Sequence, residues 1–183
     1  ADFSEFLQQS LADFMDWMAS LIKRADPSRP VISYVTYAFA QAFQWDYVWH
    51  NNVALDVICR RARHQDVLGM QIAAAEGDAH HATAAIDLVR KYGKPSWAID
   101  LLDYTSGVAA GEKSLLLTSL SVLQHGASGI SYYCWWGTPD YNYCELGVPA
   151  LRRMLGGVKQ AWQTTAGARP VAEAALIEPI MPL

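Results

Sequence analysis

The 183-residue sequence contains little charge, few cysteines and no long hydrophobic run. Charged residues make up 17% of the chain and hydrophobic residues 52%, which excludes a disordered or heavily solvated polypeptide. A net charge of -4 and the lack of a basic stripe give no reason to expect nucleic acid as a partner. The apolar runs are short and interrupted, so we expect no membrane span. The length is sufficient for one domain with its own core.

The three cysteines are Cys59, Cys134 and Cys144. An odd number without regular spacing is a poor disulfide framework. We expect buried free thiols, the alternative being a bridge between Cys134 and Cys144 across a loop. This pattern favours a reducing compartment, the cytoplasm, and no signal-peptide pattern opens the chain.

Motifs of several enzyme classes are absent as well. No GxGxxG or GxxxxGK[ST] loop is available to hold a phosphate, no GxSxG presents a serine nucleophile, and no HExxH binds zinc. The adjacent His80 and His81 would point in different directions from a helix, so they do not predict a shared metal. We expect no metal and no cofactor.

What the sequence does contain is a regular alternation of helical and strand-like segments. Apolar residues at helical spacing predict an amphipathic helix that ends before Asp26-Pro27. The strands that we predict cover residues 31–39, 66–74, 96–103 and 129–136, and the later helices lie around 51–63 and over 78–93, 111–127 and 148–165. Strands at intervals of about thirty residues, separated by helices, are typical of parallel strands joined by right-handed crossovers.

Two α/β architectures fit this order, an open doubly wound sheet and part of a (β/α)8 barrel. No glycine-rich turn follows the first predicted strand, which favours the barrel. The four predicted strands make up half of a barrel. A sequence that begins on a helix and ends as a new strand begins suggests a segment of something longer.

The stretch KPSWAIDLLD places one acid in an otherwise apolar strand. Strand alternation groups Ser96, Ala98 and Asp100 on one face and Trp97 and Ile99 on the other. We take the bulky face to meet the helices and the small face to line a barrel, with Asp100 near the mouth, where barrel enzymes keep their catalytic residues. The alternative is that Asp100 pairs with an arginine or caps the next turn.

Aromatic, amide and acidic residues gather at the ends of the other predicted strands and in the loops that follow. Paired tryptophans in YYCWWG are suited to stacking on sugar rings, although such pairs more often pack in a core. We therefore predict a carbohydrate-facing rim around Asp100. Its members are Gln71, Glu76, Asp103, Tyr133, Trp135 and Trp136.

Three stretches resemble the catalytic barrel of β-galactosidase-like glycoside hydrolases, closest to family 42. FLQQSLADFMDWMASLIKRADPSRPV resembles the approach to the fifth strand, KPSWAIDLLD the seventh strand and GASGISYYCWWG the eighth. The run ARPVAEAALIE resembles the entry into that family's next domain. The resemblance implies strands five to eight of a TIM barrel over residues 1–167, followed by a new domain or linker strand over 168–183.

The activity that this resemblance implies is retaining hydrolysis of β-galactosides by two carboxylates about 5–5.5 Å apart. The nucleophile position falls on Asp100, where the family has glutamate, and Trp135 falls on the wall of the sugar subsite. The acid/base position lies upstream of Ala1. A carboxylate misplaced by about 1 Å can cost ~100-fold in rate, so the aspartate puts full activity in doubt.

The implied partners are a carbohydrate substrate and either the N-terminal half of the barrel or another protomer, because half a barrel leaves two open sheet edges. One alternative is a non-catalytic carbohydrate-binding or structural barrel fragment that has lost hydrolysis. Another is an unrelated open-sheet enzyme with Asp100 at a switch-point crevice. A strand order that places residues 96–103 at an edge would favour the open sheet.

Overall fold

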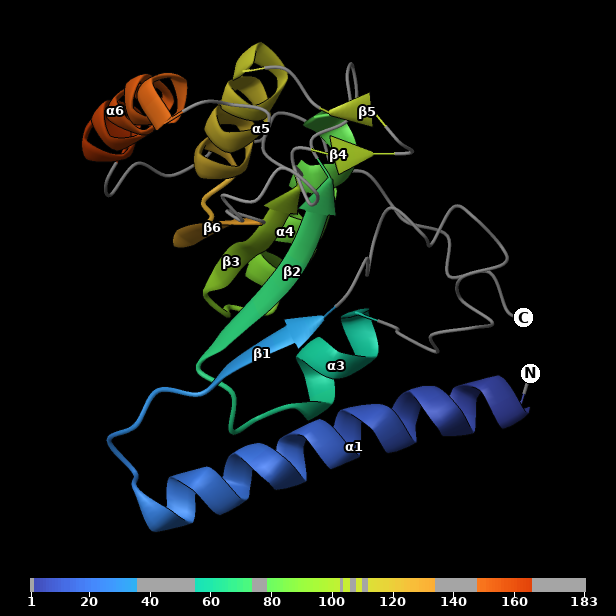
Figure 1. Cartoon of the computed structure of the whole chain (residues 1–183). Coiled ribbons are helices and arrows are strands. Elements are labelled where there is room, and N and C mark those ends of the chain that lie inside the picture. Colours follow the sequence, from blue (N-terminus) through green and yellow to red (C-terminus); the bar gives the residue numbers. More distant parts are fainter. Residues whose placement is uncertain are drawn as a thin grey trace.

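The computed structural model describes residues 2–35, 55–73, 79–102, 104–105, 108–109, 112–133 and 148–165 (Figure 1). The helices are α1 (Asp2–Ala25), α3 (Leu55–Arg61), α4 (Ala79–Lys91), α5 (Glu112–Gln124) and α6 (Val148–Thr165). The strands are β1 (Ile32–Val35), β2 (Val67–Ala73), β3 (Ser96–Leu102), β4 (Tyr104–Thr105), β5 (Val108–Ala109) and β6 (Gly129–Tyr133). The predicted helices and strands are thus confirmed within the described residues, while the antiparallel pair β4–β5 was not predicted.

Four strands form one sheet in the order β1-β2-β3-β6, and all neighbours are parallel. Each strand of this sheet lies beside the strand of the same sheet that follows it along the chain, which is the arrangement expected of successive right-handed crossovers that never change direction. β3 lies inside the sheet between β2 and β6. The edge position that would have favoured an open-sheet enzyme is therefore not found.

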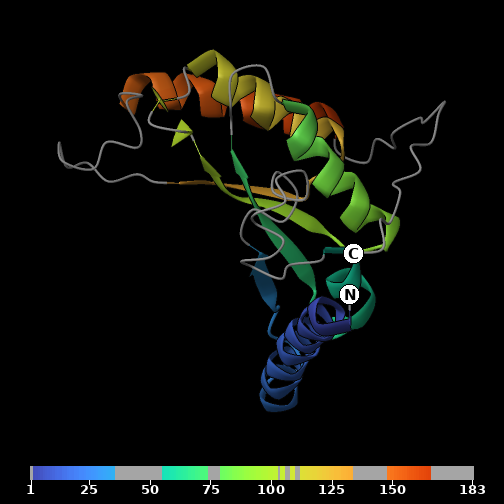
Figure 2. The same cartoon turned by 90° about the vertical axis from the view of Figure 1, so that its right-hand side faces the viewer.

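Helices cover one face of this sheet. Figure 2 shows α4, α5 and α6 on the same side of the strands. The core on that side combines one row of strand residues with apolar residues of the helices. Its most completely buried large members are Ile58, Leu68, Met70, Ile86, Leu115 and Met154. A parallel sheet with the described helices α4, α5 and α6 on one face is compatible with part of a TIM barrel.

The faces of residues 96–99 in β3 are the reverse of those predicted. Ser96 and Ala98 are fully buried, and Ala98 belongs to the helix-side core. Trp97 and Ile99 are partly exposed on the opposite face, which we call the open face. Both faces of this strand are apolar, so alternation separated the two sets but could not tell which set meets the helices.

Glycines follow two of the helices close to their predicted ends, Gly93 for the helix predicted over 78–93 and Gly126 for the one predicted over 111–127. Gly93 follows α4 with a φ of 70°, and Gly126 follows α5 with a φ of 89°. Both angles lie in the left-handed region that glycine adopts without a steric penalty. The amide of Gly93 donates to the carbonyl of Arg90 and that of Gly126 to the carbonyl of Leu123.

α1 packs through a narrow face of small residues. Ala12 and Ala19 are buried, whereas the aromatic side chains of Phe3, Phe6 and Trp17 are more than half exposed. The helix is tied to the connection around α3 by polar contacts, among them a two-point pair of Arg61 with Asp13 at 2.6 and 2.7 Å. Within the described ranges no helix combines the length and hydropathy needed to cross a membrane.

Candidate active site at the carboxyl ends of the strands

The carboxyl ends of three neighbouring strands are level. Leu102 of β3 is in register with Ala73 of β2 and with Tyr133 of β6. The backbone of Gln71 and of Asp100 lies two residues before these ends. Three of the predicted site residues are therefore brought to one edge of one sheet, at the end where α/β barrels carry their active sites. The remaining four, Glu76, Asp103, Trp135 and Trp136, lie outside the described residues.

The register of β3 is interrupted at Asp100. Toward β2, Gln71 pairs with Ile99 and Ile72 pairs with Leu101, so Asp100 is passed over. Toward β6, the pairing is also interrupted between Ala98 and Leu101. An extra residue in one strand is a β-bulge, a feature over-represented next to active sites. No signal in the sequence marks it.

Two glycines make room on the open face. A Cβ atom at Gly129 would lie 2.6 Å from Cε2 of Trp97, so the indole lies across this glycine. A Cβ atom at Gly69 would overlap Cδ1 of Ile99. Tyr34, Gly69, Trp97 and Gly129 form one row across the four strands. The open face below the site is thus filled by two large side chains of β3 lying over glycines of its neighbours.

Tyr132 belongs to the helix-covered face of the sheet. Its hydroxyl donates to Oγ of Ser119 on α5 at 3.0 Å, and burial raises its pKa despite that hydrogen bond. It is in register with Leu101. Ser131, the residue before it, is exposed on the open face. Ser131 and Tyr132 thus lie on opposite faces of β6, as strand alternation requires.

The opposite end of the sheet is fixed by charged residues that the sequence analysis did not single out. Asp66 accepts a hydrogen bond from the amide of Val31 at 2.7 Å and forms an ion pair with Lys23 at 2.6 Å. The hydrogen bond from Lys23 is the main reason that the pKa of Asp66 is below its ordinary value. Lys94 donates to the carbonyl oxygen of Ala62 at 2.7 Å. These contacts hold the strand starts in place, while the carboxyl ends stay available for chemistry.

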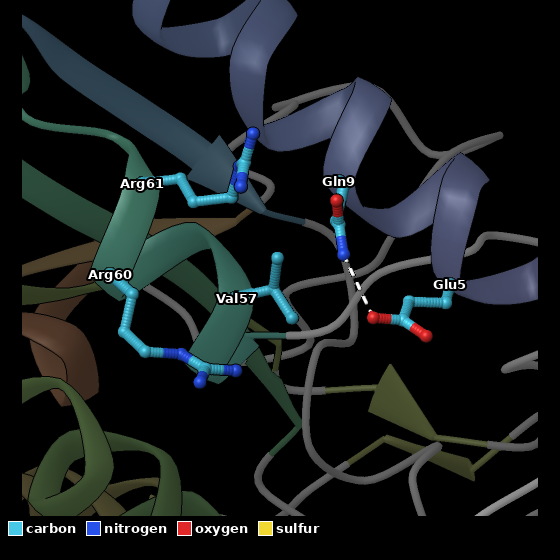
Figure 3. A pocket seen from close by; sticks show the side chains of 5 residues that line it. All are labelled: Glu5, Gln9, Val57, Arg60 and Arg61. Atoms are coloured by element: carbon cyan, nitrogen blue, oxygen red, sulfur yellow. Dashed lines mark hydrogen bonds between the residues drawn. The ribbon is translucent and has the colours of Figure 1, made fainter.

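A cavity of about 270 Å³ lies between α1 and α3 (Figure 3). Both of its arginines already have carboxylate partners, since Arg60 pairs with Asp56 at 2.7 Å and Arg61 with Asp13. None of the predicted site residues lines it, so it does not belong to the candidate active site. Its lining residues are Glu5, Gln9, Val57, Arg60 and Arg61.

In the part of the chain that the structure describes, we find neither a reactive thiol nor a metal-binding cluster. Cys59 is a buried free thiol, and burial raises its pKa to about 12, so it is a poor nucleophile. Across the described segments, no three or more His, Cys, Asp or Glu side chains are grouped so as to hold a metal ion. The other two cysteines lie outside the described residues.

Comparison with known protein families gives a match over most of the chain. The family model described as β-galactosidase, glycoside hydrolase family 42, matches residues 1–144. This range includes α1, the four-stranded sheet and the candidate site at its carboxyl end. Comparisons with curated proteins and with solved structures found no match. The chain belongs to glycoside hydrolase family 42, the family of β-galactosidases.

Proposed function

We propose that this chain supplies the nucleophile half of a retaining β-galactosidase-like glycosidase, with Asp100 as the nucleophile. The observation that carries the proposal is the position of Asp100, near the carboxyl end of an interior strand of a parallel sheet in a family 42 chain. In such a reaction a carboxylate attacks the anomeric carbon while a second carboxyl group protonates the departing oxygen. Water then cleaves the glycosyl–enzyme ester with help from the second group.

The substrate is proposed to meet Asp100 over the predicted rim. Gln71 lies on the adjacent strand β2 and is suited to hydrogen-bonding a sugar hydroxyl, as are Glu76 and Asp103 in the following connections. Tyr133 ends the other adjacent strand, and Trp135 and Trp136 follow it as proposed stacking surfaces for the sugar ring. The support for this rim is the level ending of β2, β3 and β6.

We also propose that residues 1–167 are strands five to eight of the barrel and that residues 168–183 lead into a following domain or linker. Among the described strands β1 is at one end of the sheet order, and its Ile32 and Tyr34 are 40% and 43% exposed. The neighbouring α1 exposes Phe3, Phe6 and Trp17. A parallel strand would pair with the edge of β1, and the crossover helix of that strand would cover the exposed side chains of α1. Strands and crossover helices are combined in the same way elsewhere in this sheet. The proposed occupant is the N-terminal half of the barrel, which would bring the acid/base.

The intact mass of every polypeptide in the purified material, measured under denaturing conditions, tests whether the N-terminal half of the barrel is present. A second polypeptide, or a longer chain, that carries the upstream half supports it. A single 20.3 kDa species that hydrolyses β-galactosides would contradict it, because the second carboxylate would then have to come from this chain or from another copy.

The nucleophile assignment is tested by hydrolysis of an activated aryl β-galactoside. Asp100→Ala should abolish turnover, and added azide should restore release of the aryl group with formation of a galactosyl azide, because a small anion fits where the carboxylate was removed. Asp87→Asn on α4, a carboxylate of the helix layer paired with His125, is the control and should keep activity. Full activity of Asp100→Ala would refute the assignment.

A second candidate function is carbohydrate binding without hydrolysis. The observation in its favour is aspartate at Asp100, where the resemblance expects glutamate, which shortens the side chain by one methylene. Asp100→Glu separates the two functions. If the short aspartate side chain is the reason that hydrolysis was lost, Asp100→Glu should raise turnover. If the site hydrolyses with aspartate, the substitution should lower turnover by ~100-fold. Galactoside binding without turnover in every variant would favour the binding function.

A further inference from the structure

We infer that the β-bulge in β3 transfers position 100 from the helix-covered face of the sheet to the open face. Its use in catalysis rests on the proposed function, but the placement does not. Two separate ladders carry the inference, since the pairing with β2 and the pairing with β6 both lose register within the same short stretch of β3. A slip in one ladder alone would be a local irregularity between two strands.

The faces on either side of the bulge show what it does. Before it, the even-numbered Ser96 and Ala98 are fully buried on the helix side. After it, the odd-numbered Leu101 is in register with Tyr132, which bonds to Ser119 of α5 on that same side. The parity of β3 is therefore reversed, because positions 99 and 100 both fall between two helix-side positions.

Without the bulge, residue 100 would follow Ala98 on the helix side. The buried residues that the structure describes are apolar apart from one amide and four hydroxyl residues, and none is a lysine or an arginine. The polar ones are Gln65, Thr83, Ser96, Thr118 and Ser119. An unpaired carboxylate is strongly disfavoured in such a core. The bulge therefore reconciles an acid at position 100 with a buried interior strand, and the pairing with an arginine considered from the sequence is not needed.

The reaction needs the carboxylate on the face where a substrate can reach it, and bulges commonly re-aim a side chain beside an active site. We accordingly assign the bulge a positioning role. Position 100 lies within a strand and not in a loop, which limits the freedom of its backbone to move.

Cysteine labelling of the full chain tests the placement without any need for activity. The background carries Cys134→Ala and Cys144→Ala, while the native Cys59 stays silent because it is buried. Into it are placed Ala98→Cys, Ile99→Cys, Asp100→Cys and Leu101→Cys, one at a time, and the rate of methanethiosulfonate labelling is measured on the folded protein.

The bulge predicts that Asp100→Cys reacts about 10-fold or more faster than Leu101→Cys, because thiol reactivity follows access. A regular strand predicts the reverse order, with 99 and 101 labelled and 98 and 100 protected. Equal rates, or faster labelling at 101, overturn the inference. Circular dichroism confirms the fold of each variant, and rates on the unfolded proteins correct for intrinsic reactivity.

The positioning role has its own test. The pair Ile99→Asp with Asp100→Ile keeps the composition but moves the acid one strand residue, ~3.3 Å, toward the amino end. Its kcat should fall by ~100-fold or more with far less change in KM. An unchanged kcat overturns the positioning role while leaving the labelling result intact. Conversely, labelling as predicted together with a fully active Asp100→Ala would support the placement of position 100 on the open face and refute the assignment of Asp100 as the nucleophile.

Discussion

Replacing Gly129 by alanine should destabilise the open face of the sheet, because the indole of Trp97 already fills the space that a methyl group would take. The new Cβ atom would lie 2.6 Å from Cε2 and 2.7 Å from both Cδ2 and Nε1. Carbon atoms in contact normally lie about 3.5–4.0 Å apart, so the ring must retreat by ~1 Å. Three atoms of one rigid ring are involved, and a rotation of a flexible chain end cannot relieve all of them.

The expected cost follows from overpacking. Forcing an extra methyl group into a packed site costs about 1–3 kcal/mol, and exchanging a strand glycine for alanine returns ~0.5–1 kcal/mol through backbone entropy. The net loss is at most about 2.5 kcal/mol, with a midpoint of ~1.3 kcal/mol. For a chain of this size each 1 kcal/mol lowers Tm by ~2–4 °C, so at the midpoint the variant should melt about 3–5 °C below the parent.

Urea and thermal unfolding of a double-mutant cycle measure this cost. In a Trp97→Ala background the ring is gone, so Gly129→Ala should be neutral or slightly stabilising. Gly156→Ala on α6 is the matched control, because nothing lies within 4 Å of its new Cβ, and it should stabilise by ~0.5–1 kcal/mol. An equal cost of Gly129→Ala with and without Trp97 would refute the reasoning.

Other predictions concern the ends of the sheet and its core. Because the hydrogen bond from Lys23 keeps the pKa of Asp66 below 3.8 in the folded state, the stability advantage over Asp66→Asn should be complete above about pH 5 and shrink as the pH falls through the folded pKa. Urea unfolding across that range measures it, and an advantage that grows with acid contradicts it. The Cys59 thiol, with its pKa near 12, should resist iodoacetamide at neutral pH until the protein unfolds, as peptide mass spectrometry would report. Lys94→Met should lower stability by ~1.5–3 kcal/mol by freeing a main-chain carbonyl after α3, against ~0.5 kcal/mol or less for the exposed Lys113→Met.

The order of helices and strands was accessible from the sequence because each element carries its own local signal. Apolar spacing marked α1, and the predicted ends of the helices over 78–93 and 111–127 fall at or next to Gly93 and Gly126, where the structure finds positive φ angles. The pair β4–β5 escaped prediction because two-residue strands have no periodicity to detect. The family also followed from short stretches, and the match over residues 1–144 confirms it.

The faces of β3 were not accessible, because the choice between them is made by tertiary packing. Trp97 suggested a helix-facing residue by its size, yet its indole lies over Gly129 on the open face, where the neighbouring strand leaves room. Asp100 was assigned to the substrate side by simple alternation from Ala98. That alternation fails, since Ala98 is on the helix side. Register with two neighbouring strands is a property of three segments together, and no single segment encodes the bulge.

Covalent trapping tests the role of Asp100 most directly. A 2-deoxy-2-fluoro-β-galactosyl fluoride carries a leaving group that needs no acid catalyst, and its fluorine slows hydrolysis of the glycosyl–enzyme, so the nucleophile stays labelled. Preparations that hydrolyse β-galactosides would be treated with it, digested and sequenced by mass spectrometry. We predict the sugar on Asp100, within the peptide that contains β3. A sugar on any other carboxylate would contradict the assignment.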